Sequence, residues 1–106
     1  MKNYTLEICV DSVESAVIAA ENGATRLELC SNLIIGGTTP GVELFREIRK
    51  ETEVAMHVLI RPRFGDFHYT AHEHVIMCRE IENFAREGAQ GIVLGSLHRD
   101  GTLHKE

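Results

Sequence analysis

Two short segments combine an acid with a thiol, Glu7-Ile8-Cys9 and Glu28-Leu29-Cys30, and they lie 21 positions apart in similar apolar surroundings. Each segment is typical of a β-strand, in which positions i and i+2 point to the same face of a sheet. The carboxylate and the thiol therefore project together, away from the apolar positions beside them. If the two strands are parallel neighbours, both pairs converge near the carboxyl ends of the strands, where α/β proteins build their sites.

The two cysteines indicate a site for a soft metal ion. Thiolates suit Cu(I), a monovalent d¹⁰ ion that two or three ligands satisfy, whereas two cysteines leave Zn²⁺ short of its usual four ligands. Cys9 and Cys30 are the candidate ligands, and His57, on the inward phase of its own strand, is a candidate third. The alternative is that both cysteines are small buried apolar residues, as free cysteine often is.

A second set of residues fits catalysis instead of metal binding. At the mouth of a barrel, charged side chains bind a small anionic or polyhydroxylated substrate, with arginines as clamps and a Glu or His as general base. The candidate acids and bases are Glu7, Glu28, His57 and Asp66, and the candidate anion contacts are Arg26, Arg61 and Arg63. The alternative for these charges is an ion-pair network that only holds the fold together.

Other residues with chemical potential are expected to be structural. The loop Gly36–Pro40 leads into a helix and could hold a phosphate, but it lacks the Gly-Lys-Ser/Thr ending of a P-loop, so a capped turn is preferred. Cys78 lies on the predicted apolar side of a helix and is expected in the core. The remaining histidines are expected to face solvent: His68, His72, His74, His98 and His104.

The elements that position these residues alternate between strand and helix. Strands are predicted at 6–10, 25–30, 54–60 and 91–94. The first helix is predicted to begin at an Asp11 or Ser12 cap and to end at Gly23. The second is predicted to begin with Thr39 as N-cap and Pro40 as its first residue. The third is predicted to begin at the Thr70/Glu73 capping box and to end at Gly88. The predicted apolar stripes are Val13, Ala16, Val17 and Ala20, then Leu44, Phe45 and Ile48, then Val75, Cys78, Ile81 and Ala85.

This order of elements requires parallel strands joined by right-handed crossovers. In an open doubly wound sheet, helices would bury the polar strand residues Glu7, Arg26, Glu28 and His57 at high cost, whereas a barrel places them at its interior and mouth. The fold class is therefore α/β, a parallel (β/α) barrel of the TIM type. A whole barrel needs roughly 250 residues. Residues 1–106 are thus expected to form a single partial barrel domain, about half a barrel and truncated after the fourth strand, with open edges that further chain or a homo-oligomeric partner covers.

Composition narrows the partners and the compartment. The 106 residues carry a formal charge of −5 without a basic stretch, which argues against nucleic acid and anionic membrane surfaces as partners. The first residues, from Met1, enter a strand directly, without the apolar core of a signal peptide, and no stretch is long enough to span a membrane. A cytoplasmic protein with three reduced cysteines is expected.

Five segments, in order and with matching spacing, resemble the CutC family, known as copper homeostasis proteins. They are Leu6–Ala16, Arg26–Ser31, Gly36–Pro40, Ile60–Arg63 and Gly65–Phe67. The resemblance covers nearly the whole chain.

That resemblance implies a cytoplasmic barrel, usually oligomeric, associated with copper tolerance. It also implies Cu(I) binding through the two strand cysteines, here Cys9 and Cys30. Two functions of different class are thus expected: a copper-binding or trafficking protein without turnover, or a barrel enzyme that acts on a small polar metabolite and in which the cysteines take no part.

Overall fold

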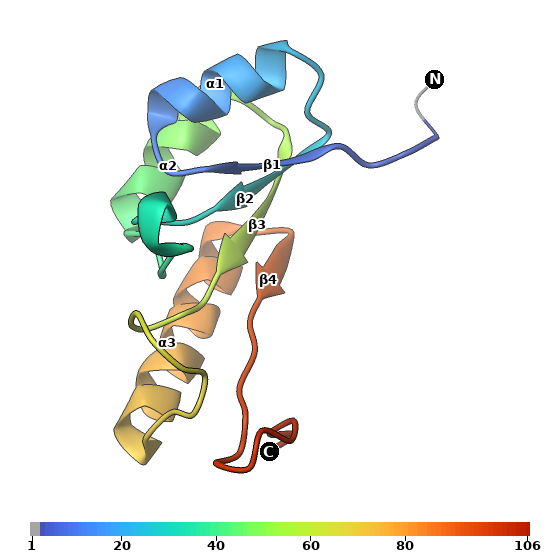
Figure 1. The fold of residues 1–106 in the computed structure, drawn as a ribbon. Coiled ribbons are helices and arrows are strands. Elements are labelled where there is room, and N and C mark those ends of the chain that lie inside the picture. The colour runs from blue at the N-terminus through green and yellow to red at the C-terminus, as the bar shows by residue number, and fades with distance from the viewer. Residues whose placement is uncertain (1–2) are drawn as a thin grey trace.

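The computed structural model describes residues 3–106, in which strands and helices alternate along the chain (Figure 1). The strands are β1 (Glu7–Val10), β2 (Arg26–Leu29), β3 (Ala55–Leu59) and β4 (Gly91–Val93). The helices are α1 (Val13–Glu21), α2 (Val42–Glu51) and α3 (Ala71–Glu87), and a 3₁₀ turn, η1 (Leu33–Ile35), follows β2. The expectation about a signal peptide rests partly on Met1 and Lys2, which lie outside the described residues. No helix within residues 3–106 has the length and apolar composition needed to cross a membrane.

The four strands form one parallel sheet in the order β1-β2-β3-β4, as predicted. Each predicted strand agrees with the observed one to within one residue at either end. The register aligns residues of the same phase into rows that cross the sheet. One row is Glu7, Arg26 and Ala55, and the next is Cys9, Glu28, His57 and Gly91.

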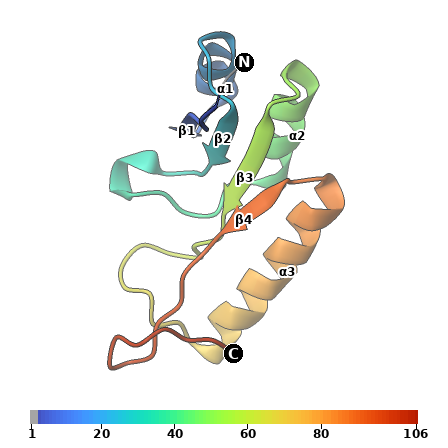
Figure 2. The same cartoon turned by 90° about the vertical axis from the view of Figure 1, so that its right-hand side faces the viewer.

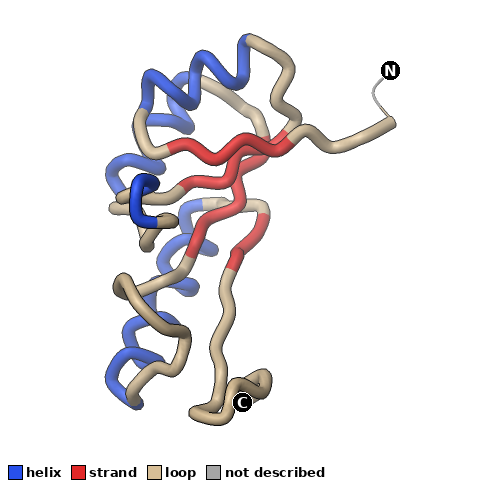
Figure 3. The backbone as a smooth tube through the Cα atoms, viewed as in Figure 1, coloured by secondary structure: helices blue, strands red, loops and turns tan. Residues whose placement is uncertain are grey.

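The three α-helices cover one face of the sheet, which confirms the arrangement expected of a barrel segment (Figures 2 and 3). The helix-facing strand residues and the helices' own apolar side chains form a single core. Its fully buried members include Leu27, Leu29, Met56, Val58 and Ile60 from the strands and Phe45 and Ile48 from α2. At roughly 1.5–3 kcal/mol for each large apolar side chain, this burial is the main force that holds the helices to the sheet.

The other face of the sheet carries no α-helix within the described residues, and we call it the open face (Figure 3). Its residues are those of the opposite phase: Glu7, Cys9, Arg26, Glu28, Cys30, Ala55, His57, Leu59, Gly91 and Val93. The polar strand residues therefore lie on the side away from the helices, as the alternation of the sequence predicted.

Helix ends follow the predicted capping residues in α1 and α3. The Ser12 hydroxyl accepts the Ser15 N–H at 3.0 Å, and Gly23 follows the C-cap of α1 with φ of +105°. In α3, Thr70 and Glu73 form the predicted capping box, and Gly88 ends the helix with φ of +93°. Between Asp11 and Ser12, the structure selects Ser12 as the cap.

The predicted start of α2 is wrong by two residues. Gly41, not Thr39, is the N-cap, and the helix begins at Val42. Thr39 instead pairs with the segment after β3: its N–H donates to the Arg61 carbonyl at 2.9 Å, and its hydroxyl accepts the Arg61 N–H at 2.8 Å. A contact with a distant segment thus takes the groups that a cap would use.

The predicted apolar stripe is confirmed for α2 and is wrong for much of α3. Met77 and Phe84 are the buried residues of α3, whereas Val75 is 48% exposed and Cys78 is exposed. The face of α3 that packs against the sheet is therefore rotated by about one residue position relative to the predicted face. Cys78 is therefore not a core residue. In α1, Ala16 is buried and Val13 packs against the core as predicted, but Ala19, not Val17 or Ala20, completes the contact.

The capping box of α3 predicts a measurable loss on Thr70→Ala. Removal of the hydroxyl leaves the Glu73 N–H without its acceptor, so the free energy of unfolding should fall by about 1 kcal/mol. His72→Ala, at an exposed position in the same helical turn, is the control and should change it by less than about 0.5 kcal/mol. Urea unfolding followed by circular dichroism measures both, and equal effects of the two changes would contradict the capping role.

Candidate functional site

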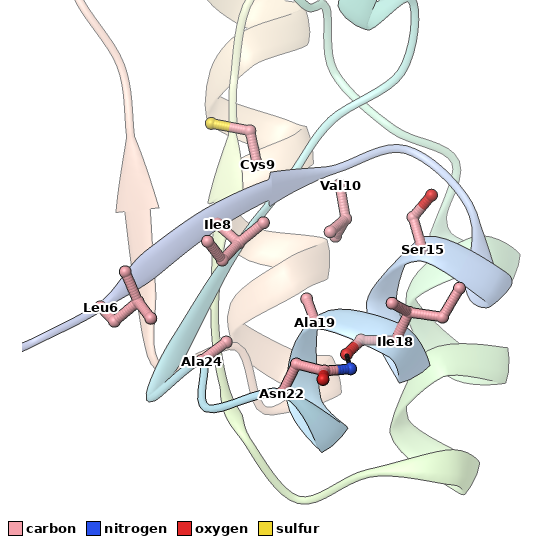
Figure 4. Close-up of a pocket in the computed structure, with 9 residues that line it drawn as sticks. All are labelled: Leu6, Ile8, Cys9, Val10, Ser15, Ile18, Ala19, Asn22 and Ala24. Carbon is pink, nitrogen blue, oxygen red and sulfur yellow. Dashed lines mark hydrogen bonds between the residues drawn. The ribbon is translucent and has the colours of Figure 1, made fainter.

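A thiol, a carboxylate and an imidazole lie side by side on the open face. Cys9, Glu28 and His57 are register partners on β1, β2 and β3, so they occupy one row across the sheet. The Cys9 sulfur donates to Glu28 Oε2 at 3.5 Å. Figure 4 shows Cys9 on the opposite side of β1 from Ile8 and Val10. The sequence analysis gave Cys9 as a candidate metal ligand, Glu28 as a candidate acid or base and His57 as a candidate for either role. The strand register places the three next to one another.

The last position of this row is Gly91, and its lack of a side chain makes room for His57. A Cβ atom at Gly91 would lie 2.7 Å from Nε2 of the His57 ring and 2.8 Å from two ring carbons. Such distances are too short for any real side chain. The imidazole therefore lies over the backbone of β4, where glycine permits the close approach.

An ion pair occupies the preceding row of the open face. Arg26 Nε lies 2.6 Å from Glu7 Oε2, and the two side chains are 34% and 28% exposed. Arg26 and Glu7, which the sequence offered as an anion contact and an acid, thus bind each other. A pair this exposed contributes at most about 1 kcal/mol to stability.

Cys30 lies beyond the row of Cys9, beneath the loop that follows β2. The side chain is 1% exposed, and its sulfur lies 3.7 Å from the Val10 carbonyl. Gly37 covers it so closely that a Cβ atom there would lie 3.4 Å from the Cys30 sulfur and 2.9 Å from Leu59 Cδ2. Because Gly37 also has φ of +90°, only glycine fits this position without strain.

The two candidate ligands therefore lie in different surroundings on the same face. Cys9 pairs with Glu28, two positions before Cys30, so the thiols occupy adjacent strands in successive rows. Burial, and then the Glu28 carboxylate, raises the pKa of the exposed Cys9 thiol. Burial, followed by the nearby Cys9 and Asp11, raises the pKa of Cys30 to about 11. Both thiols are protonated at neutral pH.

Within residues 3–106, no group of three or more histidine, cysteine or acidic side chains is placed so that it could hold a metal ion. The soft donors that the open face offers are therefore the sulfurs of Cys9 and Cys30, together with the imidazole of His57 in the row of Cys9.

Arg61 joins two loops through its guanidinium group. Its Nη1 donates to the Gly37 carbonyl at 3.0 Å, and its Nη2 donates to the Gly65 carbonyl at 2.9 Å. The guanidinium also lies over the Phe67 ring, 5.0 Å from the centroid. These contacts give the candidate anion contact Arg61 partners within the protein, and they hold the loop over Cys30 in place.

Arg63 and Asp66 belong to a second network, at the start of α3. Arg63 donates to Glu73 at 2.8 Å and to Asp66 at 3.1 Å. The N–H of His68, and then Arg63, lowers the pKa of the Asp66 carboxyl. Asp66, a candidate acid or base, is thus held as an anion in a loop and bonds to these neighbours rather than to the Cys9, Glu28 and His57 row.

Three of the remaining histidines stack on one another. The ring of His104 lies 4.6 Å from that of His98 and 4.8 Å from that of His74, centroid to centroid. His74 also lies within hydrogen-bond distance of the Ser96 hydroxyl, at 2.9 Å. The predicted exposure is correct for His98, as it is for His68 and His72, but His74 and His104 are half-buried. Spacing in the sequence gives no sign of this stack, because the segment after β4 folds back to form it.

Comparison with known proteins gives one consistent result. The family model of the CutC family matches residues 4–106. The copper homeostasis protein cutC homologs of Mus musculus and Homo sapiens are each 45% identical over 103 residues, which is 97% of this chain and 38% of theirs. A CutC protein of Treponema denticola is 41% identical, and 42% of it is covered. A CutC crystal structure from Streptococcus agalactiae superposes with a TM-score of 0.82 at 31% identity, over 92% of this chain and 48% of that one. The chain thus spans less than half the length of these relatives.

The close approach of His57 to Gly91 predicts that Gly91→Ala is destabilising. The added methyl group must displace the imidazole, which should cost about 1–3 kcal/mol in the free energy of unfolding and shift the ring resonances of His57. Gly95→Ala is the matched control, because a Cβ there meets no atom within 4 Å. Urea unfolding and NMR of the histidine rings measure both effects. Unmoved His57 resonances in Gly91→Ala would contradict the packing described.

The surroundings of the thiols predict their rates of alkylation. On folded protein at pH 7.5, Cys30 should react with iodoacetamide at least about tenfold more slowly than the exposed Cys78, because it is buried and protonated. Its rate should then rise with pH toward about 11, where the thiolate forms. Mass spectrometry of the peptides follows each cysteine separately. Reaction of Cys30 at the rate of Cys78 would show that the loop over it is open.

Proposed function

The chain belongs to the CutC family, and we propose that it acts in copper homeostasis in the cytoplasm, binding Cu(I) through Cys9 and Cys30. The mammalian relatives are named copper homeostasis proteins, and this chain matches 38% of their length. The observation that carries the proposal is the placement of two sulfurs on adjacent strands of the open face, at the carboxyl ends where sites of such folds lie.

The chemistry of the two thiols favours a soft monovalent ion over a hard one. Thiolate ligands select Cu(I), which needs only two or three donors. Cys9 is exposed and offers the point of entry, whereas the buried Cys30 offers a donor shielded from water. His57, in the row of Cys9, is the nearest candidate for a third donor in the sheet.

Proton release accompanies binding in this proposal, because the metal needs thiolates and both thiols are protonated at neutral pH. The Cys9 thiol already donates to Glu28 Oε2, so this carboxylate is placed to accept the proton. The loop over Cys30 has to yield to the ion, or the ion has to reach Cys30 from the side of Cys9.

An enzyme that acts on a small polar or anionic metabolite is the second candidate, and the adjacency of Glu28 and His57 favours it. A carboxylate beside an imidazole is a common arrangement for a general base. Glu7, Arg26, Arg61, Arg63 and Asp66 are already bonded within the protein, so in this alternative a substrate would contact Glu28 and His57 first. Arginines would bind an anion only by exchanging their present partners.

Cysteine variants test the copper site directly. Cys9→Ser and Cys30→Ser should each weaken Cu(I) binding by at least about tenfold in competition with a chelator under reducing conditions, because a serine oxygen does not replace a thiolate for this ion. Cys78→Ser is the matched control and should bind as the unaltered chain does, since Cys78 lies exposed on α3. Unchanged affinity in the folded Cys9→Ser, Cys30→Ser double variant would remove the site. A loss of substrate-dependent signal in Glu28→Gln or His57→Gln, with normal cysteine variants, would favour the enzyme.

The raised thiol pKa values predict the direction of the pH dependence. The apparent Cu(I) affinity should rise by about tenfold per pH unit for each thiol proton that the ion displaces, and this rise should continue through neutral pH toward the thiol pKa values. Chelator competition at several pH values between 6 and 9, corrected for protonation of the chelator, measures the slope. A flat profile would indicate that thiolates are not the ligands.

A further inference from the structure

We propose that Arg61 is the latch of a lid over Cys30, and that this lid opens when the Arg61 guanidinium exchanges the loop carbonyls that it binds for the hydroxyl of Tyr69. The lid is the segment 31–38, which follows β2. The inference concerns access to the Cys30 sulfur and does not depend on copper binding. It rests on the few bonds that hold the lid down and on two buried polar atoms beside the latch.

The lid forms a loop that is closed at its base. Ser31 and Thr38 bond to each other through their backbones, with N···O distances of 2.9 and 2.7 Å. The Asn32 side chain donates to the Thr38 hydroxyl at 2.9 Å, and the Asn32 carbonyl accepts the N–H groups of Ile35 and Gly37 at 3.0 and 3.1 Å. All of these bonds lie within the lid. The lid can therefore move as a unit about its base without losing them.

Arg61 supplies the hydrogen bonds that tie the tip of the lid to the rest of the protein. Its Nη1 donates to the Gly37 carbonyl at 3.0 Å and to the Ile35 carbonyl at 3.4 Å. Among residues 3–106, no other hydrogen bond joins positions 32–37 to a residue outside the lid. Loss of the two bonds from Arg61 therefore leaves only the packing of Gly37 to cover the Cys30 sulfur.

Two buried polar atoms beside the latch have no hydrogen-bond partner among the described residues: Arg61 Nε and the Tyr69 hydroxyl oxygen. The Phe67 ring lies between the two side chains, with its centroid 5.0 Å from the Arg61 guanidinium and 6.4 Å from that of the Tyr69 ring. Burial raises the pKa of the Tyr69 hydroxyl, and the nearby charge of Arg61 opposes that rise. Buried polar groups without partners cost free energy, which a bond between them would recover. The closed lid thus leaves a second partner for Arg61 close by.

An exchange of partners lowers the cost of opening the lid. When the lid lifts, the Gly37 and Ile35 carbonyls bond to water, and the Arg61 guanidinium turns to donate to the Tyr69 oxygen. The hydrogen bond gained there offsets part of what the lid contacts lose. The Gly65 carbonyl, which accepts from Arg61 Nη2 at 2.9 Å, anchors the arginine in both states. Cys30 is then reached through a minor open state of the protein rather than through a permanent channel.

The alkylation rate of Cys30 reports how often the lid opens, and two variants should move it in opposite directions. Arg61→Lys removes the forked donor that holds the lid, so Cys30 should react with iodoacetamide at least about tenfold faster. Tyr69→Phe removes the acceptor that the open lid uses, so Cys30 should react at least about threefold more slowly. A purely structural role of Tyr69 predicts the opposite sign, because a loosened fold exposes the thiol.

Arg46→Lys is the matched control, because Arg46 bonds to Glu43 and Glu87 and not to the lid. It should change the Cys30 rate by less than about twofold. Mass spectrometry of the peptides gives each rate at one pH, and circular dichroism shows which variants are folded. An unchanged Cys30 rate in folded Arg61→Lys would overturn the latch. If Arg61→Lys does not fold, Tyr69→Phe decides alone: a rate equal to that of the unaltered chain, or faster, would overturn the proposal.

Discussion

The two-residue period of the parallel strands is the constraint on which the rest of this structure depends. It sends Leu27, Leu29 and Val58 into the helical layer and Cys9, Glu28 and His57 to the open face. A slip of one residue in any strand would exchange the two sets, exposing apolar area and burying charge beneath helices. The hydrophobic core therefore fixes the register, and the register places the thiol, carboxylate and imidazole in one row.

Two arginines hold the loops near the carboxyl ends of the strands in place. Arg61 and Arg63 lie just after β3, where a site would be expected, but they bond to carbonyls and carboxylates of neighbouring segments. The planar guanidinium suits such multiple contacts better than an ammonium group. The consequence for function is indirect: by holding the loop that contains Gly37, Arg61 keeps Cys30 covered. A ligand that reaches Cys30 therefore has to displace this loop or pass beside it.

The open face carries both thiols of the proposed copper site. Raised pKa values keep Cys9 and Cys30 protonated, so the Cu(I) binding that we propose would be coupled to proton release. The two thiols differ in access, since Cys9 is exposed and Cys30 is buried beneath the loop of Gly37.

The sequence by itself determined the strands, their parallel order, the side on which their polar residues lie and the caps at Ser12 and Thr70, because alternation and capping are local properties of a few consecutive residues. It also carried the family resemblance. Only the tertiary structure decided that Met77 and Phe84, not Val75 and Cys78, anchor α3, and that Thr39 binds Arg61 instead of capping α2. The burial of Cys30, the partners of the arginines and the histidine stack were decided there too. Each of these depends on contacts between segments distant in the chain, which local spacing does not encode.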